Sequence, residues 1–155
     1  MASKWVVGID PGKKGSASLF EITDAQEIFL NSVIAFENDP DWRKHLYETC
    51  LFKRPKLVLL ENVHSFSGQG VKSMFSFGWQ RGAADTAVYL ANSPLEFMTP
   101  QAWQIKLGIY RKGKPAQKKL ALLNFPWIKT IEGDIFAGVL IGYVAAMRFS
   151  PWYSK

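Results

Sequence analysis

The sequence predicts an α/β fold in which a five-stranded mixed sheet is flanked by helices. Short apolar runs alternate with longer segments whose apolar residues recur at helical spacing. Two of the short runs, residues 5–10 and 56–61, end in a carboxylate, as expected where neighbouring strands build a site at their carboxyl ends. The chain has 155 residues, which predicts one domain with a substantial buried core.

The first third of the chain predicts an antiparallel meander followed by a helix. The first three strands are joined by connections that are too short for crossovers. Pro11 and Gly12 end the first strand abruptly. Asp39 or Asp41 provides the capping signal for the first helix, which ends before Pro55.

The rest of the chain predicts a parallel strand pair and several helices. The apolar run before Glu61 follows a helix and indicates a central parallel strand. The long helix that follows is broken or loosened at Gly78 and Gly82, and the last helix is apolar almost all round, which is typical of a buried helix. In chain order, the expected elements are strands over residues 5–10, 16–22 and 27–36, a helix over 42–52, a strand over 56–61, a helix over 71–91, a strand over 95–98, and helices over 99–107, 116–124 and 134–149.

Three acidic residues stand where a strand ends or a helix begins. Asp10 and Glu61 end two strands of the sheet, and Asp134 opens the last helix. Each has a simpler explanation, because Asp10 can start a turn, Glu61 can be a solvated charge, and Asp134 can cap the helix. Together they suit a hard divalent cation such as Mg²⁺, and an all-oxygen site also accepts Mn²⁺. Such ions activate water and stabilise the leaving oxygen of a phosphodiester.

The composition favours a polyanionic partner. Nineteen basic residues against thirteen acidic ones give a net charge of +6. The basic loop over residues 108–115 is either a solvated turn or a phosphate contact. The single cysteine, Cys50, excludes a disulfide framework and predicts a cytoplasmic setting. No apolar stretch reaches the roughly 20 residues that span a bilayer, and no signal peptide is expected, since the first strand begins at once.

The order of the elements is that of the ribonuclease H-like fold, and specific motifs narrow the resemblance. The chain resembles the RuvC family of Holliday junction resolvases over nearly all of residues 1–155, as a single RuvC-like domain. In its compact length and its Pro-x-x-Trp segment, the chain resembles the phage-borne branch of this family more than the bacterial branch. The motifs are Gly8-Ile9-Asp10-Pro11-Gly12, Leu59-Leu60-Glu61-Asn62-Val63, Gly78-Trp79-Gln80-Arg81-Gly82, Pro100-Gln101-Ala102-Trp103, Lys114 before a helix, and Asp134 opening a buried helix.

The resemblance implies a homodimeric, Mg²⁺-dependent endonuclease of DNA recombination and repair. Such an enzyme nicks two opposed strands of a four-way DNA junction, in the host-cell cytoplasm if a phage encodes it. Its catalytic, metal-binding acids would be Asp10, Glu61 and Asp134, with a fourth acid at position 137, where this chain has Ala137. Alanine cannot bind a cation, so we expect impaired catalysis. An engineered substitution and a natural loss of activity both explain Ala137.

The resemblance also implies residues that contact DNA. Lys114 matches a lysine near the scissile phosphate, whereas a second lysine position holds Gln104, with Lys106 as the nearest cation. Phe66 is a candidate for stacking on an unpaired base, or it anchors its loop on the core. The helix from Val71 resembles the dimer helix of the family. The candidate DNA-binding residues are Lys13, Lys14, Phe66, Lys72, Arg81, Lys106, Arg111, Lys112, Lys114 and Lys118.

Other functions are compatible with parts of this pattern. A ribonuclease H-like nuclease that acts on RNA shares the first-strand motif but lacks the Pro-x-x-Trp segment. A non-catalytic junction-binding protein of the same fold would explain Ala137. An actin-like or sugar-kinase ATPase also begins with Asp-x-Gly, but it needs a second half that 155 residues cannot supply.

Overall fold

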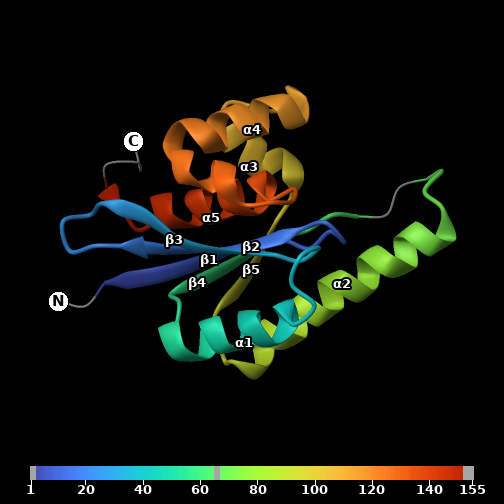
Figure 1. Cartoon of the computed structure of the whole chain (residues 1–155), viewed down its shortest axis with the longest axis horizontal. Coiled ribbons are helices and arrows are strands. Elements are labelled where there is room, and N and C mark those ends of the chain that lie inside the picture. The colour runs from blue at the N-terminus through green and yellow to red at the C-terminus, as the bar shows by residue number, and fades with distance from the viewer. Residues whose placement is uncertain (1–2, 65–66, 152–155) are drawn as a thin grey trace.

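The computed structural model describes residues 3–64 and 67–151, and it places a five-stranded sheet between two layers of helices (Figure 1). Helices α3, α4 and α5 cover one face of the sheet, and α1 and α2 cover the other (Figure 1). This architecture confirms the predicted α/β fold class. The strands are β1 Lys4–Asp10, β2 Ser16–Ile22, β3 Ile28–Ala35, β4 Leu57–Glu61 and β5 Leu95–Met98. The helices are α1 Trp42–Lys53, α2 Val71–Leu90, α3 Pro100–Lys106, α4 Gly113–Asn124, the 3₁₀ helix η1 Pro126–Thr130 and α5 Phe136–Met147.

The strand order is β3-β2-β1-β4-β5, so β1 lies at the centre of the sheet. The pairs β1–β2 and β2–β3 are antiparallel, which confirms the meander, and β4 runs parallel to both β1 and β5. In the β1–β4 pair, Ile9 lies opposite Leu60. The next residues along the two strands, Asp10 and Glu61, therefore leave the sheet side by side at its carboxyl edge.

Several helix boundaries differ from the predicted ones. Helix α2 is continuous through Gly78 and Gly82, because a glycine inside a helix costs only about 1 kcal/mol. Helix α4 begins at Gly113, three residues early, since a proline is tolerated in a first turn. Helix α5 begins only at Phe136, and the residue at its N-cap position makes no side-chain capping bond. Asp134 thus precedes the helix and does not cap it.

The start of the first helix also differs in detail. Asp41 occupies the N-cap position of α1, but its side chain makes no capping hydrogen bond. Asp39 instead accepts a hydrogen bond from the backbone N–H of Asp41, at 3.0 Å, and contacts His45 at 2.6 Å. Asp39 therefore organises the turn before α1.

Helix α5 is the buried helix that its apolar sequence predicts, and it rests directly on β1 and β2. The hydroxyl of Ser16 donates to the carbonyl of Ile135 at 3.2 Å, and that of Ser18 donates to the carbonyl of Gly138 at 2.7 Å. A Cβ atom added at Gly8 would overlap the backbone of Gly142. The helix and the strand are in backbone contact, so the start of α5 is fixed relative to the carboxyl end of β1.

In the part of the chain that the structure describes, no helix combines the length and the hydropathy that crossing a membrane requires.

The close contact between α5 and β1 yields a stability prediction. The substitution Gly8→Ala should lower the free energy of unfolding by about 3 kcal/mol or more, because a methyl group has no room against the backbone of α5. Urea unfolding followed by circular dichroism measures this change. Gly70→Ala is the matched control, since Gly70 has extended backbone and open space around its Cα. Equal stabilities of the two variants would contradict the packing described for α5.

Candidate active site

Asp10 ends β1, and a tight turn keeps its carboxylate at the edge of the sheet. The backbone N–H of Gly12 donates to Oδ1 of Asp10 at 3.1 Å, and the N–H of Gly15 donates to the carbonyl of Gly12 at 2.8 Å. Burial raises the pKa of Asp10 above its ordinary value, and the nearby charge of Asp134 adds to this rise. The N–H of Gly12 and the charge of Lys114 oppose it.

Glu61 ends β4 beside Asp10, and its side chain is only 8% exposed. The indole nitrogen Nε1 of Trp103 donates a hydrogen bond to Oε2 of Glu61 at 2.6 Å. Burial raises the pKa of Glu61 to about 7, the neighbouring charge of Asp10 adds to the rise, and the bond from Trp103 opposes it. The two strand-end acids therefore repel each other across the edge of the sheet.

Asp134 reaches the same region from the segment before α5. The ammonium of Lys114, in the first turn of α4, donates to Oδ2 of Asp134 at 2.5 Å. This bond raises the pKa of Lys114, and the charge of Asp10 contributes to the same rise. Lys114 and the acids therefore share one electrostatic environment, although Asp10, Lys114 and Asp134 lie far apart in the sequence.

The three carboxylates share one pattern of hydrogen bonding. Each has one oxygen that accepts from a protein donor, and the structure gives its second oxygen no protein hydrogen bond within the described residues. Oxygen donors of this kind fit Mg²⁺ or Mn²⁺, and a cation would offset the repulsion between the buried acids. Within residues 3–64 and 67–151, however, no three His, Cys, Asp or Glu side chains are gathered closely enough to form a ready-made cage. The acids have the right chemistry, and binding requires their side chains to converge.

The predicted fourth acid position, Ala137, is the second residue of α5. Its side chain is half-buried and packs against the apolar cluster on that face of the sheet. Asp134 precedes the helix, so positions 134 and 137 do not both lie within α5. An acid at position 137 would stand in the first turn of α5, where the helix dipole favours negative charge.

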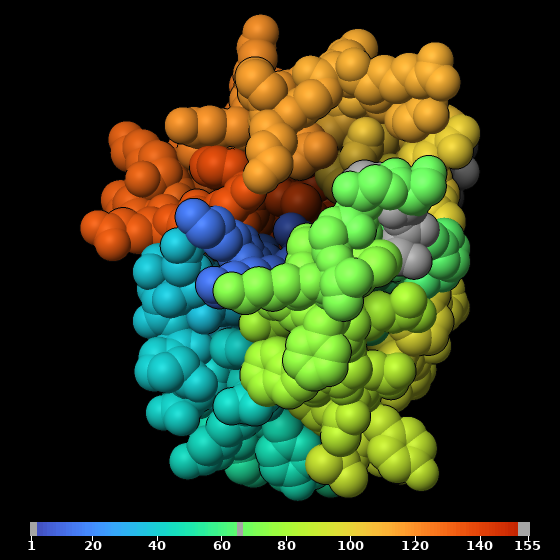
Figure 2. Space-filling view, turned by 90° about the vertical axis from the view of Figure 1, so that its right-hand side faces the viewer, coloured from blue at the N-terminus to red at the C-terminus, as the bar shows by residue number. Residues whose placement is uncertain are grey.

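Basic residues surround a recess at the carboxyl end of β1. In Figure 2 the blue turn after β1, the green start of α2 and the orange segment that contains α4 surround this recess. Lys13 and Lys72 line one hollow of about 510 Å³ together with Ser73 and Ser76. The structure therefore brings Lys13 and Lys72 together, and it places Lys114 at the acids.

The other candidate DNA-binding residues are more scattered. Lys14 pairs with Glu37 at 3.4 Å. The ammonium of Lys118 lies 5.7 Å from the centre of the Phe136 ring, at the start of α5. Lys106, Arg111 and Lys112 are exposed around the loop between α3 and α4. The guanidinium of Arg81 lies 4.9 Å from the ring centre of Phe97 in β5. Phe66 lies outside the described residues.

Trp103 is a site residue for which the sequence alone predicts no role. The Pro-x-x-Trp segment was recognised as a motif, but its contact with Glu61 depends on how α3 folds back over the end of β4. A buried tryptophan beside a buried acid leaves no periodic signal in a sequence. Only the requirement that an indole N–H find an acceptor hinted at a polar partner.

No protein-family profile and no curated protein matches the sequence. Solved structures do match. The chain is similar to Thermus thermophilus RuvC, with 18% identity, a TM-score of 0.64 and coverage of 94% of this chain and 95% of that one. It is similarly close to the same organism's RuvC in complex with a Holliday junction substrate, with a TM-score of 0.65.

Two further matches come from other sources. The fowlpox virus Holliday junction resolvase is 15% identical, with a TM-score of 0.58 and coverage of 93% of this chain and 99% of that one. The yeast mitochondrial Holliday junction resolvase Ydc2 is 15% identical, with a TM-score of 0.54 and coverage of 88% and 75%. At these identities the matches show the fold, so the chain has the ribonuclease H-like fold of these resolvases. Membership of the phage-borne branch stays a prediction.

The raised pKa of Glu61 yields a prediction about stability and pH. The folded state holds the Glu61 proton more tightly than the unfolded state, so the free energy of unfolding falls as the pH rises from 4.5 to about 7. Without divalent cations, Glu61→Gln should therefore stabilise the protein by about 1–3 kcal/mol above this range and little below it. Thermal unfolding on both sides of the range measures the difference. Glu21→Gln on β2 is the control, and an equal gain at both pH values would contradict the effect of burial.

Proposed function

We propose that this protein is an endonuclease that binds four-way DNA junctions as a homodimer and hydrolyses phosphodiesters with Mg²⁺ or Mn²⁺, its cleavage being weakened by Ala137. The observation that carries the proposal is the meeting of Asp10, Glu61 and Asp134 at one edge of a sheet with the resolvase fold. The structure of Thermus thermophilus RuvC with a Holliday junction substrate supports the choice of DNA.

Each residue of the site has a role in this proposal. Asp10, Glu61 and Asp134 would hold the cation through the oxygens that make no protein hydrogen bond within the described residues. A cation held there would serve to activate water and to stabilise the charge that develops on the leaving oxygen. Lys114 stays protonated at neutral pH, since its pKa is raised, and its ammonium is able to donate to a phosphate oxygen beside the acids. The burial of Asp10 and Glu61 strengthens their electrostatic interactions.

The basic residues around the recess would hold the DNA backbone. Lys13 and Lys72 line a hollow next to the turn that follows Asp10, and Lys118 lies at the start of α5. Contacts of this kind neutralise phosphates and carry no sequence information. We therefore expect junction binding that weakens steeply as the salt concentration rises.

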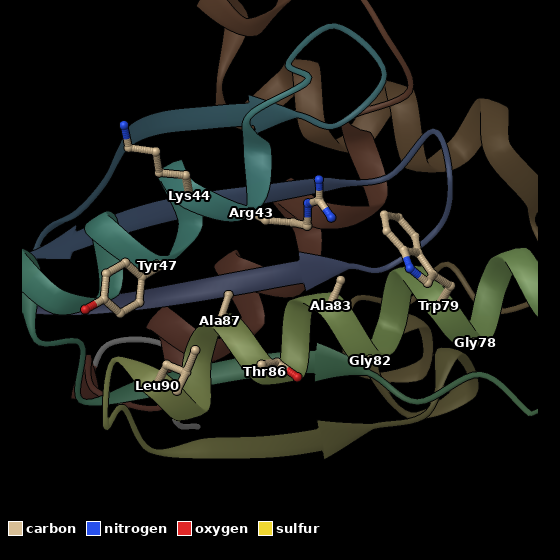
Figure 3. A pocket seen from close by; sticks show the side chains of 10 residues that line it. All are labelled: Arg43, Lys44, Tyr47, Gly78, Trp79, Gly82, Ala83, Thr86, Ala87 and Leu90. Carbon is tan, nitrogen blue, oxygen red and sulfur yellow. The ribbon is translucent and has the colours of Figure 1, made fainter.

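The homodimer in this proposal rests on a groove between α1 and α2 (Figure 3). The floor of the groove, about 680 Å³ in volume, consists of small residues of α2 that include Gly78, Gly82 and Ala83. Arg43 and Trp79 point toward each other at one end, where the guanidinium lies 5.0 Å from the ring centre (Figure 3). Two copies related by a two-fold axis would place α2 against α2, and two opposed cuts need two such sites.

Large exposed apolar side chains continue the same stripe of α2 beyond the groove. Val71 is 80% exposed and Phe75 is 76% exposed, and both precede the part of α2 that lines the groove. Residues at these intervals share one face of a helix. A contiguous apolar face on a surface helix is typical of a protein interface.

A second candidate function is binding of the junction without cleavage. Ala137 favours it, and so does the absence of a ready-made metal cage in the described part of the chain. This alternative keeps the fold, the dimer and the basic recess. It differs from the proposed function only in the chemistry, so a cleavage assay separates the two.

Restoring an acid at position 137 tests the catalytic part of the proposal. Ala137→Asp should raise Mg²⁺-dependent cutting of a four-way junction by at least about tenfold, because it adds a fourth carboxylate near the cation. Gel electrophoresis of labelled junction and duplex DNA, with Mg²⁺ and with Ca²⁺, measures cutting and binding together.

Ala137→Asn is the matched control, since it has the same shape without the charge and should stay as slow as the parent. If Ala137→Asp binds the junction but cuts no faster than Ala137→Asn, the protein is a non-catalytic junction binder. Cleavage of single-stranded RNA in place of junction DNA would reject the resolvase proposal altogether.

The dimer interface is tested with a charge placed in the groove. Gly82→Glu should shift the protein from dimer to monomer, raising the dissociation constant by more than about tenfold, because it buries an unpaired carboxylate against the second copy. Sedimentation velocity at several concentrations measures this change. Lys119→Glu on α4 is the control for an added negative charge. A dimer that persists in Gly82→Glu would place the interface elsewhere.

A further inference from the structure

Trp103 lies over the end of β4 because of how the chain turns after β5. The backbone N–H of Asn62 donates to the carbonyl of Met98 at 2.8 Å, so the ends of β4 and β5 remain paired. Thr99 then caps α3, its hydroxyl accepting from the N–H of Ala102 at 3.2 Å, and Pro100 occupies the first turn. This turn brings Trp103, one turn into the helix, back toward Glu61.

The surroundings of Trp103 are apolar apart from one group. The side chain is 1% exposed and belongs to the core cluster on the α5 face of the sheet. Its N–H nevertheless has a partner, Oε2 of Glu61, in a short hydrogen bond of 2.6 Å. A buried N–H without a partner costs about 1–3 kcal/mol, so this bond satisfies two buried polar groups at once.

Because of this bond, the two oxygens of Glu61 have different surroundings. Oε2 is held by the indole, and Oε1 has no protein hydrogen bond within the described residues. A rigid aromatic ring packed in the core holds its N–H in one direction, so the carboxylate is restricted to one orientation. A loosely held side chain would have to lose rotamer freedom when it bound a ligand.

We infer that Trp103 is a positioning residue that holds Glu61 through Oε2 and leaves Oε1 for the divalent cation. The inference rests on the proposed metal site, and it assigns to the Pro-x-x-Trp segment a definite part in metal affinity. Partners that orient a metal-binding carboxylate in this way typically contribute 10–100-fold to affinity.

The test compares two Trp→Phe substitutions in buried cores. Trp103→Phe keeps an aromatic ring and removes the N–H. Trp42→Phe is the matched control, because Trp42 is also buried but packs on Phe36 on the opposite face of the sheet, with ring centres 4.1 Å apart. Free Mn²⁺ measured by electron paramagnetic resonance gives the affinity of each folded variant without any need for DNA or cleavage.

We expect Trp103→Phe to bind Mn²⁺ about tenfold more weakly than the parent chain, and Trp42→Phe to bind it as the parent does. The indole ¹H–¹⁵N signals in nuclear magnetic resonance spectra of the parent chain provide a second readout, which does not depend on how tightly the protein binds metal. The signal that disappears in Trp103→Phe should shift in Glu61→Ala, and Mn²⁺ should broaden it before the signals of the other tryptophans.

The possible failures are distinguishable. The positioning role is wrong if Trp103→Phe leaves the Mn²⁺ affinity unchanged, or if the indole signal of Trp103 does not shift in Glu61→Ala. Either result would leave the proposed metal site intact. If the parent chain binds no Mn²⁺, the proposed metal site is wrong, and the positioning role of Trp103 is wrong with it. The same conclusion follows if the Asp10→Asn variant binds Mn²⁺ as tightly as the parent chain does. An equal loss of affinity in both Trp→Phe variants would assign the effect to core packing alone and overturn the inference.

Discussion

The rest of the structure depends on the direct contact between the backbones of α5 and β1. Gly8 and Gly142 allow this contact, and the hydroxyls of Ser16 and Ser18 fix the helix lengthwise by bonding to carbonyls at its start. Because the position of α5 on the sheet is fixed, the segment before α5 places Asp134 near the edge of the sheet where β1 and β4 end. Residues far apart in the chain thus meet because glycines allow one helix to touch the backbone of the central strand.

The site that results carries more negative charge than its protein surroundings neutralise. Burial raises the pKa of both Asp10 and Glu61. The charge of Asp134 adds to the rise at Asp10, the charge of Asp10 adds to the rise at Glu61, and Lys114 binds Asp134. Such an arrangement costs folding free energy unless a cation joins it, which is common where a site is built for a ligand and not for stability. An acid at position 137, where this chain has Ala137, would add one further negative charge to this region and so increase the repulsion in the free protein.

Most of the fold could be predicted because its signals are local. Short apolar runs defined the five strands, and the short first connections defined the meander. The acids were found because strand ends are visible in a sequence. Helix starts were less well predicted, since Asp134 looked like a cap and is instead bound by Lys114. The contact of Trp103 with Glu61 depends on tertiary packing between α3 and β4, which no residue spacing encodes.

The continuity of α2 has a consequence for symmetry. Twenty unbroken residues make a rod about 30 Å long, and its first half projects past the edge of the sheet toward the recess (Figure 1). In a two-fold dimer that pairs α2 with α2, this rod would act as a spacer between the two recesses. The separation and the angle between two opposed cuts would then follow from the rise of one helix and the crossing angle of the pair, and flexible loops would have little influence on them.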